Sequence, residues 1–234
     1  MAKILENSFR AANIAFADEW GRYAEAVGVD LFQVLDAIRM RPTHNNIRQP
    51  GFGVGGYCLT KDPLFAAASA GQIFDRAGLD FPFCRLTVET NREMPLRNLA
   101  RLRALLGGSL AQKRILMLGV AYRSEVDDTR YSAAETFVRA CEREGAAVTL
   151  CDPYVRHWEE LDRAVAQALP APGEFDAVVF AVPHKAYREF DPAAWLGTAR
   201  PIVFDADNVL SDATRRKLRA GGVRVESVGR GDGL

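Results

Sequence analysis

The feature that most constrains this chain is a regular alternation in its second half. After residue 107, short runs of β-branched and other apolar residues are separated by segments with helical spacing. The runs are RILMLGV, AVTLCDP, FDAVVFAVP, PIVFDAD and VRVESV. Strands that alternate with helices in this way form a parallel sheet covered by helices. We therefore predict an α/β fold with a Rossmann-like domain over residues 108–234.

The first half has a different pattern, which predicts helices. Apolar residues recur at helical spacing over residues 2–27, and a shorter helix is expected over residues 31–39. Another helix is expected over residues 82–106, where Pro95 should kink or divide it. We predict a helical central domain over residues 1–107, with this last helix as the connector to the α/β domain.

A long loop without periodicity, RPTHNNIRQPGFGVGGYC, lies between these helices. Loops of this length in compact domains are usually functional or disordered. Its GFGVGG segment fits the G-x-G-x-x-G pattern of dinucleotide sites, but such a site needs a strand before the glycines and a helix after them. No strand precedes them here, so the pattern does not predict an NAD site. The glycines do allow the backbone to approach a ligand closely.

Cys58 follows these glycines and is a candidate nucleophile. A buried thiol in a tight turn is the ordinary alternative. Nearby Lys61 can favour the thiolate, and a glycine-rich loop can present backbone N–H groups to an anion. Asp62 can cap a helix that starts at Pro63, and this role is compatible with one in catalysis.

Other polar residues offer weaker signals. Lys3 and Asn7 are four residues apart and share one face of the first helix. In the second half, Gly119 alone remains of a glycine fingerprint after the first strand. Arg123 and Arg130 can make charge-assisted contacts with phosphate, although surface salt bridges are the alternative for both.

The remaining ionisable side chains and the composition exclude several functions. His157 and His184 stand beside no acidic cluster, so we interpret them as ordinary surface or loop histidines. The 30 basic residues balance the 30 acidic ones, which gives no reason to expect nucleic acid or an acidic membrane as a partner. No apolar run approaches the roughly 20 residues of a membrane span, and no secretion signal is apparent. We expect a cytoplasmic protein.

The four cysteines form no C-x-x-C pair, which argues against a zinc site or another metal centre and against disulfides. We expect reduced thiols. The first helix also carries four aromatic residues, Phe9, Phe16, Trp20 and Tyr23. A monomer of this size does not readily cover so much aromatic surface, so we predict a homodimer through the central helices.

Three segments resemble motifs of the UDP-glucose/GDP-mannose dehydrogenase family, in the family's order. KILENSFRAANIAFADEW resembles the helix that opens its central domain, GFGVGGYCLTKDP its catalytic cysteine loop, and GVAYRSEVDDTRYSA the start of its UDP-binding domain. The resemblance implies an NAD-dependent enzyme of polysaccharide biosynthesis that oxidises the C6 alcohol of a UDP-sugar to a uronic acid. It also implies an N-terminal NAD domain, which is not part of this sequence.

The resemblance assigns roles residue by residue. Cys58 would form a thiohemiacetal and then a thioester. Lys3 and Asn7 would stabilise the oxyanion, and Asp62 would assist water or proton transfer. The remaining matches are Lys61 and Arg130 for NAD, and Gly53, Gly55, Gly56, Tyr57, Tyr122 and Arg123 for the substrate.

Two positions depart from the family pattern. Asp207 stands where many relatives have an arginine that contacts UDP, and His44 aligns with an arginine that reaches the neighbouring subunit's substrate. The alternative function is a noncatalytic nucleotide-sugar-binding or dimerisation module. A reading frame that continues upstream of Met1 into a glycine fingerprint would favour the enzyme. In either case we expect the chain alone to bind UDP weakly and to oxidise nothing, and the sequence does not identify the sugar.

Overall fold

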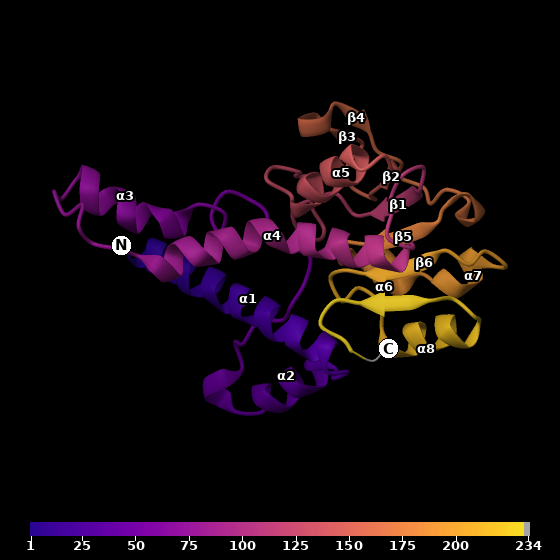
Figure 1. Cartoon of the computed structure of the whole chain (residues 1–234), viewed down its shortest axis with the longest axis horizontal. Helices are drawn as coiled ribbons and strands as arrows, with labels where there is room; N and C mark the ends of the chain where they lie inside the picture. The colour runs from indigo at the N-terminus through magenta and orange to yellow at the C-terminus, as the bar shows by residue number, and fades with distance from the viewer. Residues whose placement is uncertain (232–234) are drawn as a thin grey trace.

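A computed structural model describes residues 1–231 of the chain as a helical part followed by an α/β part (Figure 1). The helices are α1 (Ala2–Ala26), α2 (Leu31–Arg39), α3 (Phe65–Gln72), α4 (Pro82–Leu105), α5 (Ala133–Arg143), α6 (Lys185–Glu189), α7 (Pro192–Leu196) and α8 (Asp212–Ala220). The strands are β1 (Arg114–Leu118), β2 (Ala147–Cys151), β3 (His157–Trp158), β4 (Arg163–Ala164), β5 (Ala177–Phe180), β6 (Ile202–Asp205) and β7 (Val225–Ser227). Short 3-10 helices include η1 (Pro42–His44) and η2 (Asp62–Leu64).

The α/β part is built on a parallel sheet in the order β2-β1-β5-β6-β7. Alternate residues of each strand face opposite sides of the sheet. In β1, Ile115 and Met117 pack with residues of α4 and α5, whereas Leu116 and Leu118 pack with residues of α6, α7 and α8. Both faces of the sheet are therefore covered, and the predicted α/β fold with a Rossmann-like sheet is confirmed.

Helix α4 lies beside α1 and extends from the helical part onto the sheet (Figure 1). The expectation that Pro95 divides this helix is wrong, because α4 continues through it. Proline cannot donate a hydrogen bond to the carbonyl of Asn91, four residues earlier. That carbonyl and the Pro95 ring lie against Gly53, so the glycine loop packs on this face of α4.

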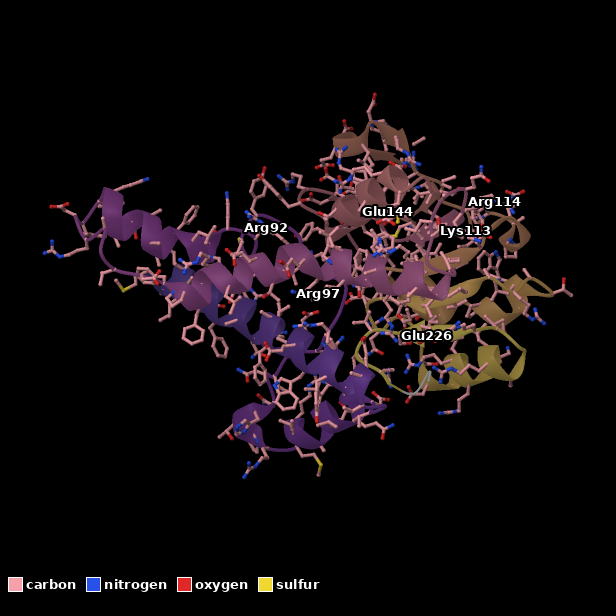
Figure 2. All side chains as sticks on the ribbon, viewed as in Figure 1. Arg92, Arg97, Lys113, Arg114, Glu144 and Glu226 are labelled. Carbon is pink, nitrogen blue, oxygen red and sulfur yellow. The ribbon has the colours of Figure 1, made fainter. Side chains whose placement is uncertain are left out.

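Ion pairs join α4 to both parts of the molecule. Arg97 donates to buried Asp18 of α1 over 2.8 Å. One turn later, Arg101 lies 2.8 Å from Glu25 of α1 and 3.1 Å from Glu226 of β7. Figure 2 labels Arg97 and Glu226 on the two sides of this junction. The connector is therefore fixed to the parts that it joins.

The corner between α1 and α2 is also held by residues close to the end of the chain. The N–H of Gly229 donates to the Glu25 carboxylate, and the Leu31 N–H donates to the Gly229 carbonyl. Arg230 forms an ion pair with Asp30. Residues separated by about 200 positions in the sequence thus meet at one corner.

The helical part leaves much apolar surface open. The four aromatic residues of α1 named above are all exposed, and so are Ile73, Phe74 and Phe83. A separate core cluster of this part consists of Ala24, Leu31 and Leu35 with Ile47 against them. No helix among the described residues is long and apolar enough to cross a membrane.

Candidate active site

The glycine loop, residues 51–57, is anchored on both sides. Asn91 of α4 accepts from the Val54 N–H and donates to the Val54 carbonyl, each over 2.8 Å. From the α/β part, the Arg130 carbonyl accepts from the Gly56 N–H over 3.2 Å. Asn91 therefore satisfies both backbone groups of Val54, as a neighbouring strand would.

The glycines are required because the second half of the chain presses against them. A Cβ on Gly55 would collide with the Tyr131 carbonyl, and one on Gly56 would lie 3.1 Å from the ring of Tyr122. Gly56 also has a φ of 79°, in the region that favours glycine. The close approach expected from these glycines is thus made by Tyr122 and Tyr131 of the protein itself.

Cys58 is exposed at the end of this loop, and Asp62 lies one turn away. The Asp62 N–H donates to the Cys58 carbonyl over 2.8 Å. The buried Asp62 carboxylate accepts from the Asn7 side-chain amide over 2.8 Å and lies 3.8 Å from the Lys3 ammonium. The structure therefore brings Lys3, Asn7 and Asp62 together beside the turn that carries Cys58.

The expected helix cap at Asp62 is wrong. Asp62 is the first residue of η2, and its side chain makes no capping hydrogen bond. The physical reason is position, because Asp62 lies inside η2 and its carboxylate instead accepts from the Asn7 amide of α1. Pro63 does stand near the start of this short helix, as expected.

Cations surround Tyr57 on the exposed side of the loop. The Lys61 ammonium lies 4.8 Å from the centre of the Tyr57 ring, and the Arg130 guanidinium lies 5.2 Å from it. Arg130 also forms a bidentate ion pair with Asp128, which raises the pKa of Arg130 and lowers that of Asp128. Of the two alternatives for Arg130, a phosphate contact and a surface salt bridge, the salt bridge is therefore present.

A cavity of about 250 Å³ opens between the glycine loop, α4 and the start of α5. Its lining residues are Val54, Thr60, Lys61, Asn91, Arg92, Pro95, Tyr131, Ser132, Ala133, Glu135 and Thr136. Figure 2 labels Arg92 on the α4 side. The cavity has cationic and hydroxyl groups in its wall and lies next to the loop that ends at Cys58. No group of three or more metal-ligating side chains occurs in residues 1–231.

Comparison with known proteins supports one family for both parts of the chain. The model of the UDP-glucose/GDP-mannose dehydrogenase family, central domain, matches residues 1–93, and that of the family's UDP binding domain matches residues 116–212. The two matches together cover most of the chain. The chain belongs to the UDP-glucose/GDP-mannose dehydrogenase family.

Individual relatives agree with this family. UDP-N-acetyl-D-mannosamine dehydrogenase from Methanocaldococcus jannaschii is 30% identical over 90% of this chain and 47% of the relative. The protein of the same name from Pyrococcus horikoshii is 31% identical over 99% of this chain and 52% of its own. The crystal structure of NDP-N-acetyl-D-galactosaminuronic acid dehydrogenase from Methanosarcina mazei Go1 superposes with a TM-score of 0.86 and 27% identity, covering 99% of this chain and 51% of that one. This family member spans about half the length of these relatives.

In this member of the dehydrogenase family, the backbone N–H groups of residues 119–122, directly after β1, are hydrogen-bonded within the protein. The N–H groups of Gly119 and Tyr122 donate to backbone carbonyls, and those of Val120 and Ala121 donate to Asp152. Gly119 itself is needed for packing, because a Cβ there would collide with Val182. The backbone near Gly119, the one remaining glycine of the fingerprint, therefore has its N–H groups occupied.

The interpretation of His184 as an ordinary surface or loop residue is wrong. His184 is fully buried, and its Nε2 lies 3.1 Å from Oδ2 of Asp152, which is fully buried as well. Burial raises the pKa of Asp152, but hydrogen bonds from His184 and from the backbone hold it below its ordinary value. The two residues follow different strands, and the fold brings them together because the carboxyl ends of β2 and β5 meet at one edge. His157, in contrast, is exposed.

The two departures from the family pattern have different surroundings. Asp207 accepts from the Phe52 N–H of the glycine loop, and a Cβ on Gly51 would collide with its carboxylate. Burial and the nearby Asp205 raise the pKa of Asp207 to about 8. His44 is exposed in η1 and contacts Thr43. Asp207 thus holds the loop that leads to Cys58.

Proposed function

We propose that this chain forms the central and UDP-binding parts of an NAD-dependent UDP-sugar 6-dehydrogenase. The observation that carries the proposal is the convergence of Lys3 and Asn7 on Asp62, one turn from an exposed Cys58. The names of the relatives support a nucleotide sugar as substrate, and among them N-acetylated sugars recur.

In the proposed reaction Cys58 is the nucleophile. Loss of a proton and a hydride turns the C6 alcohol into an aldehyde, and the Cys58 sulfur adds to its carbon as a thiohemiacetal. Loss of a second hydride from C6, together with the proton of the thiohemiacetal hydroxyl, gives a thioester. Water then attacks the thioester carbon, the C–S bond breaks, and a carboxylate and the free thiol result.

The three polar neighbours have separate roles in this scheme. The Lys3 ammonium donates to the oxyanion that develops at C6, and electrostatic stabilisation of this kind is usually a large term in catalysis. One hydrogen of the Asn7 amide is bonded to Asp62, and the other is available for the same oxyanion. Asp62 accepts a proton from the attacking water.

NAD, when bound, accepts the hydride in each of the two oxidations. Lys61 and Arg130 fit its pyrophosphate, because both are cations on the open side of the loop beside Cys58. Residues 1–231 contain no strand–glycine–helix unit that matches a dinucleotide fingerprint. We therefore expect the chain by itself neither to bind NAD nor to produce NADH.

UDP recognition is assigned to Tyr122 and Arg123. Arg123 is exposed, its guanidinium lies 5.6 Å from the Tyr122 ring, and it makes no ion pair with any described residue. An uncommitted guanidinium can bind a diphosphate by charge-assisted hydrogen bonds. The exposed aromatic face of α1 is assigned to a second copy of the chain, which makes the proposed protein a homodimer.

Calorimetry with UDP tests this assignment on the chain itself. Arg123→Ala should weaken UDP binding by about 1.5–3 kcal/mol, the range for a hydrogen bond to a charged group. Arg200→Ala is a matched control, because Arg200 is exposed and bonds only to nearby carbonyls. Equal affinities of the parent and Arg123→Ala would contradict the assignment.

Protection of Cys58 tests the catalytic part. A saturating UDP-sugar should slow iodoacetamide labelling of Cys58 severalfold and leave the rate at Cys84 unchanged. UDP binding without protection would favour a noncatalytic nucleotide-sugar module. Measurable NADH production by the purified chain would overturn the assignment of the NAD site.

A further inference from the structure

The loop after β1 is held by a buried network that the reaction scheme does not use. Asp152 accepts from five donors: the N–H groups of Val120, Ala121, Tyr154 and Val155, and Nε2 of His184. The distances lie between 2.8 and 3.2 Å. A carboxylate with this many donors is saturated, so it fixes the start of the loop to β2.

His184 holds the other end of the loop. Its Nδ1 accepts from the Glu125 N–H over 3.1 Å. Because Nδ1 accepts, the ring proton must be on Nε2, which donates to Asp152. One imidazole therefore connects the carboxylate at the beginning of the loop with the backbone at its end.

Glu125 closes the loop in a conformation that needs support. Its φ of 64° lies in the left-handed region, which is unfavourable for residues other than glycine. Its carboxylate accepts from the Lys185 N–H over 2.7 Å and from the Tyr154 hydroxyl over 2.5 Å. The Tyr154 ring also packs against His184, with 5.1 Å between the centres. These contacts stabilise the turn.

The network leaves one segment of the loop available. The N–H groups of residues 119–122 and of Glu125 are all bonded within the protein, whereas no hydrogen bond in the described part of the chain uses those of Arg123 and Ser124. The Arg123 side chain is exposed at the same point. Two backbone donors and a guanidinium are thus presented together, as an anionic diphosphate requires.

We propose that Asp152 and His184 are positioning residues, which hold the loop after β1 so that Arg123 and Ser124 face the diphosphate of the substrate. The network extends to the glycine loop, because the Tyr122 side chain packs on Gly55 with its Cβ and on Gly56 with its ring. The proposal rests on the proposed function only in naming the ligand. The geometry of the loop is independent of it.

The first measurement is calorimetry of UDP with variants of the intact chain. Loss of the imidazole in His184→Ala should raise the Kd for UDP about tenfold, because the Glu125 turn is released. His184→Gln, which keeps a donor and an acceptor, should restore binding to within about threefold of the parent. Tyr154→Phe leaves the core intact and should raise the Kd about threefold.

Two controls separate positioning from stability. Tyr187→Phe removes a buried hydroxyl beside the same histidine. This hydroxyl shares the Cys151 carbonyl with the Gly119 N–H and makes no bond to residues 120–125. It should lower the unfolding temperature and leave the Kd unchanged. His157→Ala should change neither. If His184→Ala and Tyr154→Phe bind UDP like the parent at a temperature where all variants are folded, the proposal is wrong.

Hydrogen exchange gives a readout that does not depend on UDP. In His184→Ala and Tyr154→Phe, the amides of peptides covering residues 120–131 should exchange about tenfold faster than in the parent, and Tyr187→Phe should leave them unchanged. If the parent chain does not bind UDP, the proposed function fails while this measurement still decides the positioning role. Unchanged exchange in both variants would overturn it.

Discussion

The helical part and the α/β part of this chain treat apolar side chains and thiols in opposite ways. The α/β part closes both faces of its sheet and buries its two cysteines, Cys141 and Cys151. The helical part leaves its α1 aromatics and Cys58 exposed and Cys84 partly so. The α/β part therefore has a complete core, whereas the helical part leaves a thiol and aromatic side chains exposed on its surface.

We interpret this difference as a division of roles between the two parts. A closed sheet supplies a rigid edge from which loops can present ligand contacts. In the proposed function the helical part supplies the nucleophile and the contact with a second copy, so its side chains need access to solvent or to another surface. Four measurements test this contrast between the two parts.

Thiol reactivity should show the largest difference. Burial raises the pKa of Cys141 to about 12, and it raises that of Cys151 as well. A shift of about three units lowers the thiolate fraction about a thousandfold, and only the thiolate reacts quickly. In limited iodoacetamide labelling read by mass spectrometry, Cys58 should be modified first and the two buried thiols last. Early labelling of Cys141 would contradict a closed α/β core.

The second largest difference between the two parts should be the loss of stability when a large apolar side chain is truncated. Phe137 of α5 is fully buried and packs on Phe52 of the glycine loop, with ring centres 5.2 Å apart. Phe137→Ala should lower the free energy of unfolding by about 3–5 kcal/mol. Phe83→Ala, at an exposed position in α4, should change it by less than about 0.5 kcal/mol. Urea unfolding measures both, and comparable losses would mean that Phe83 is covered in solution.

Association should give a smaller effect. Phe16→Asp places a charge in the exposed aromatic face of α1 and should weaken the expected homodimer by about 2 kcal/mol, as at an interface hot spot. Met40→Asp adds the same charge at an exposed position on the far end of α2 and is the control. Light scattering at tens of micromolar measures the mass. A monomeric parent chain would end the dimer proposal.

The smallest effect concerns the contact between the parts. The folded pKa of Asp207, about 8, is above the unfolded value of about 4, so the folded state holds the proton more tightly. The contribution of Asp207 to stability is full below pH 4 and is lost as the pH rises through 8. Because Asp207 is only half-buried, we expect the loss between pH 6 and pH 9 to be about 1–2 kcal/mol.

Asp207→Asn is the matched variant for this effect, since it cannot ionise. The difference in unfolding free energy between parent and variant, measured by urea at each pH, should favour the variant increasingly as the pH rises. A difference that stays constant from pH 6 to pH 9 would show that Asp207 is not protonated in the folded chain.

The sequence predicted the fold class because periodicity alone distinguishes the two parts. It also placed Lys3 and Asn7 on one helical face, and their meeting with Asp62 followed from the family resemblance. It was wrong about a division of α4 at Pro95 and about the cap at Asp62. Local propensity depends on a residue's neighbours in the chain. Gly53 is a neighbour of Pro95, and Asn7 is a neighbour of Asp62, only in space.

Asn91, Asp152 and His184 were missed for a related reason. Their partners lie 37, 32 and 59 residues away, beyond any periodic pattern. A usable signal did exist for two of them. Asp152 directly follows β2, and His184 follows β5 by a few residues, so a parallel sheet must bring them to one edge. The order β2-β1-β5, which the sequence does not specify, decides that they touch.

The corner where Glu25, Asp30 and Leu31 meet Gly229 and Arg230 has a consequence for how the chain folds. A contact across about 200 residues closes a very long loop. The entropy cost of closing this loop becomes small only after the intervening segments have folded. During synthesis, residues 229 and 230 also leave the ribosome after everything they contact. The junction of α1 and α2 is therefore synthesised about 200 residues before the neighbours that complete it.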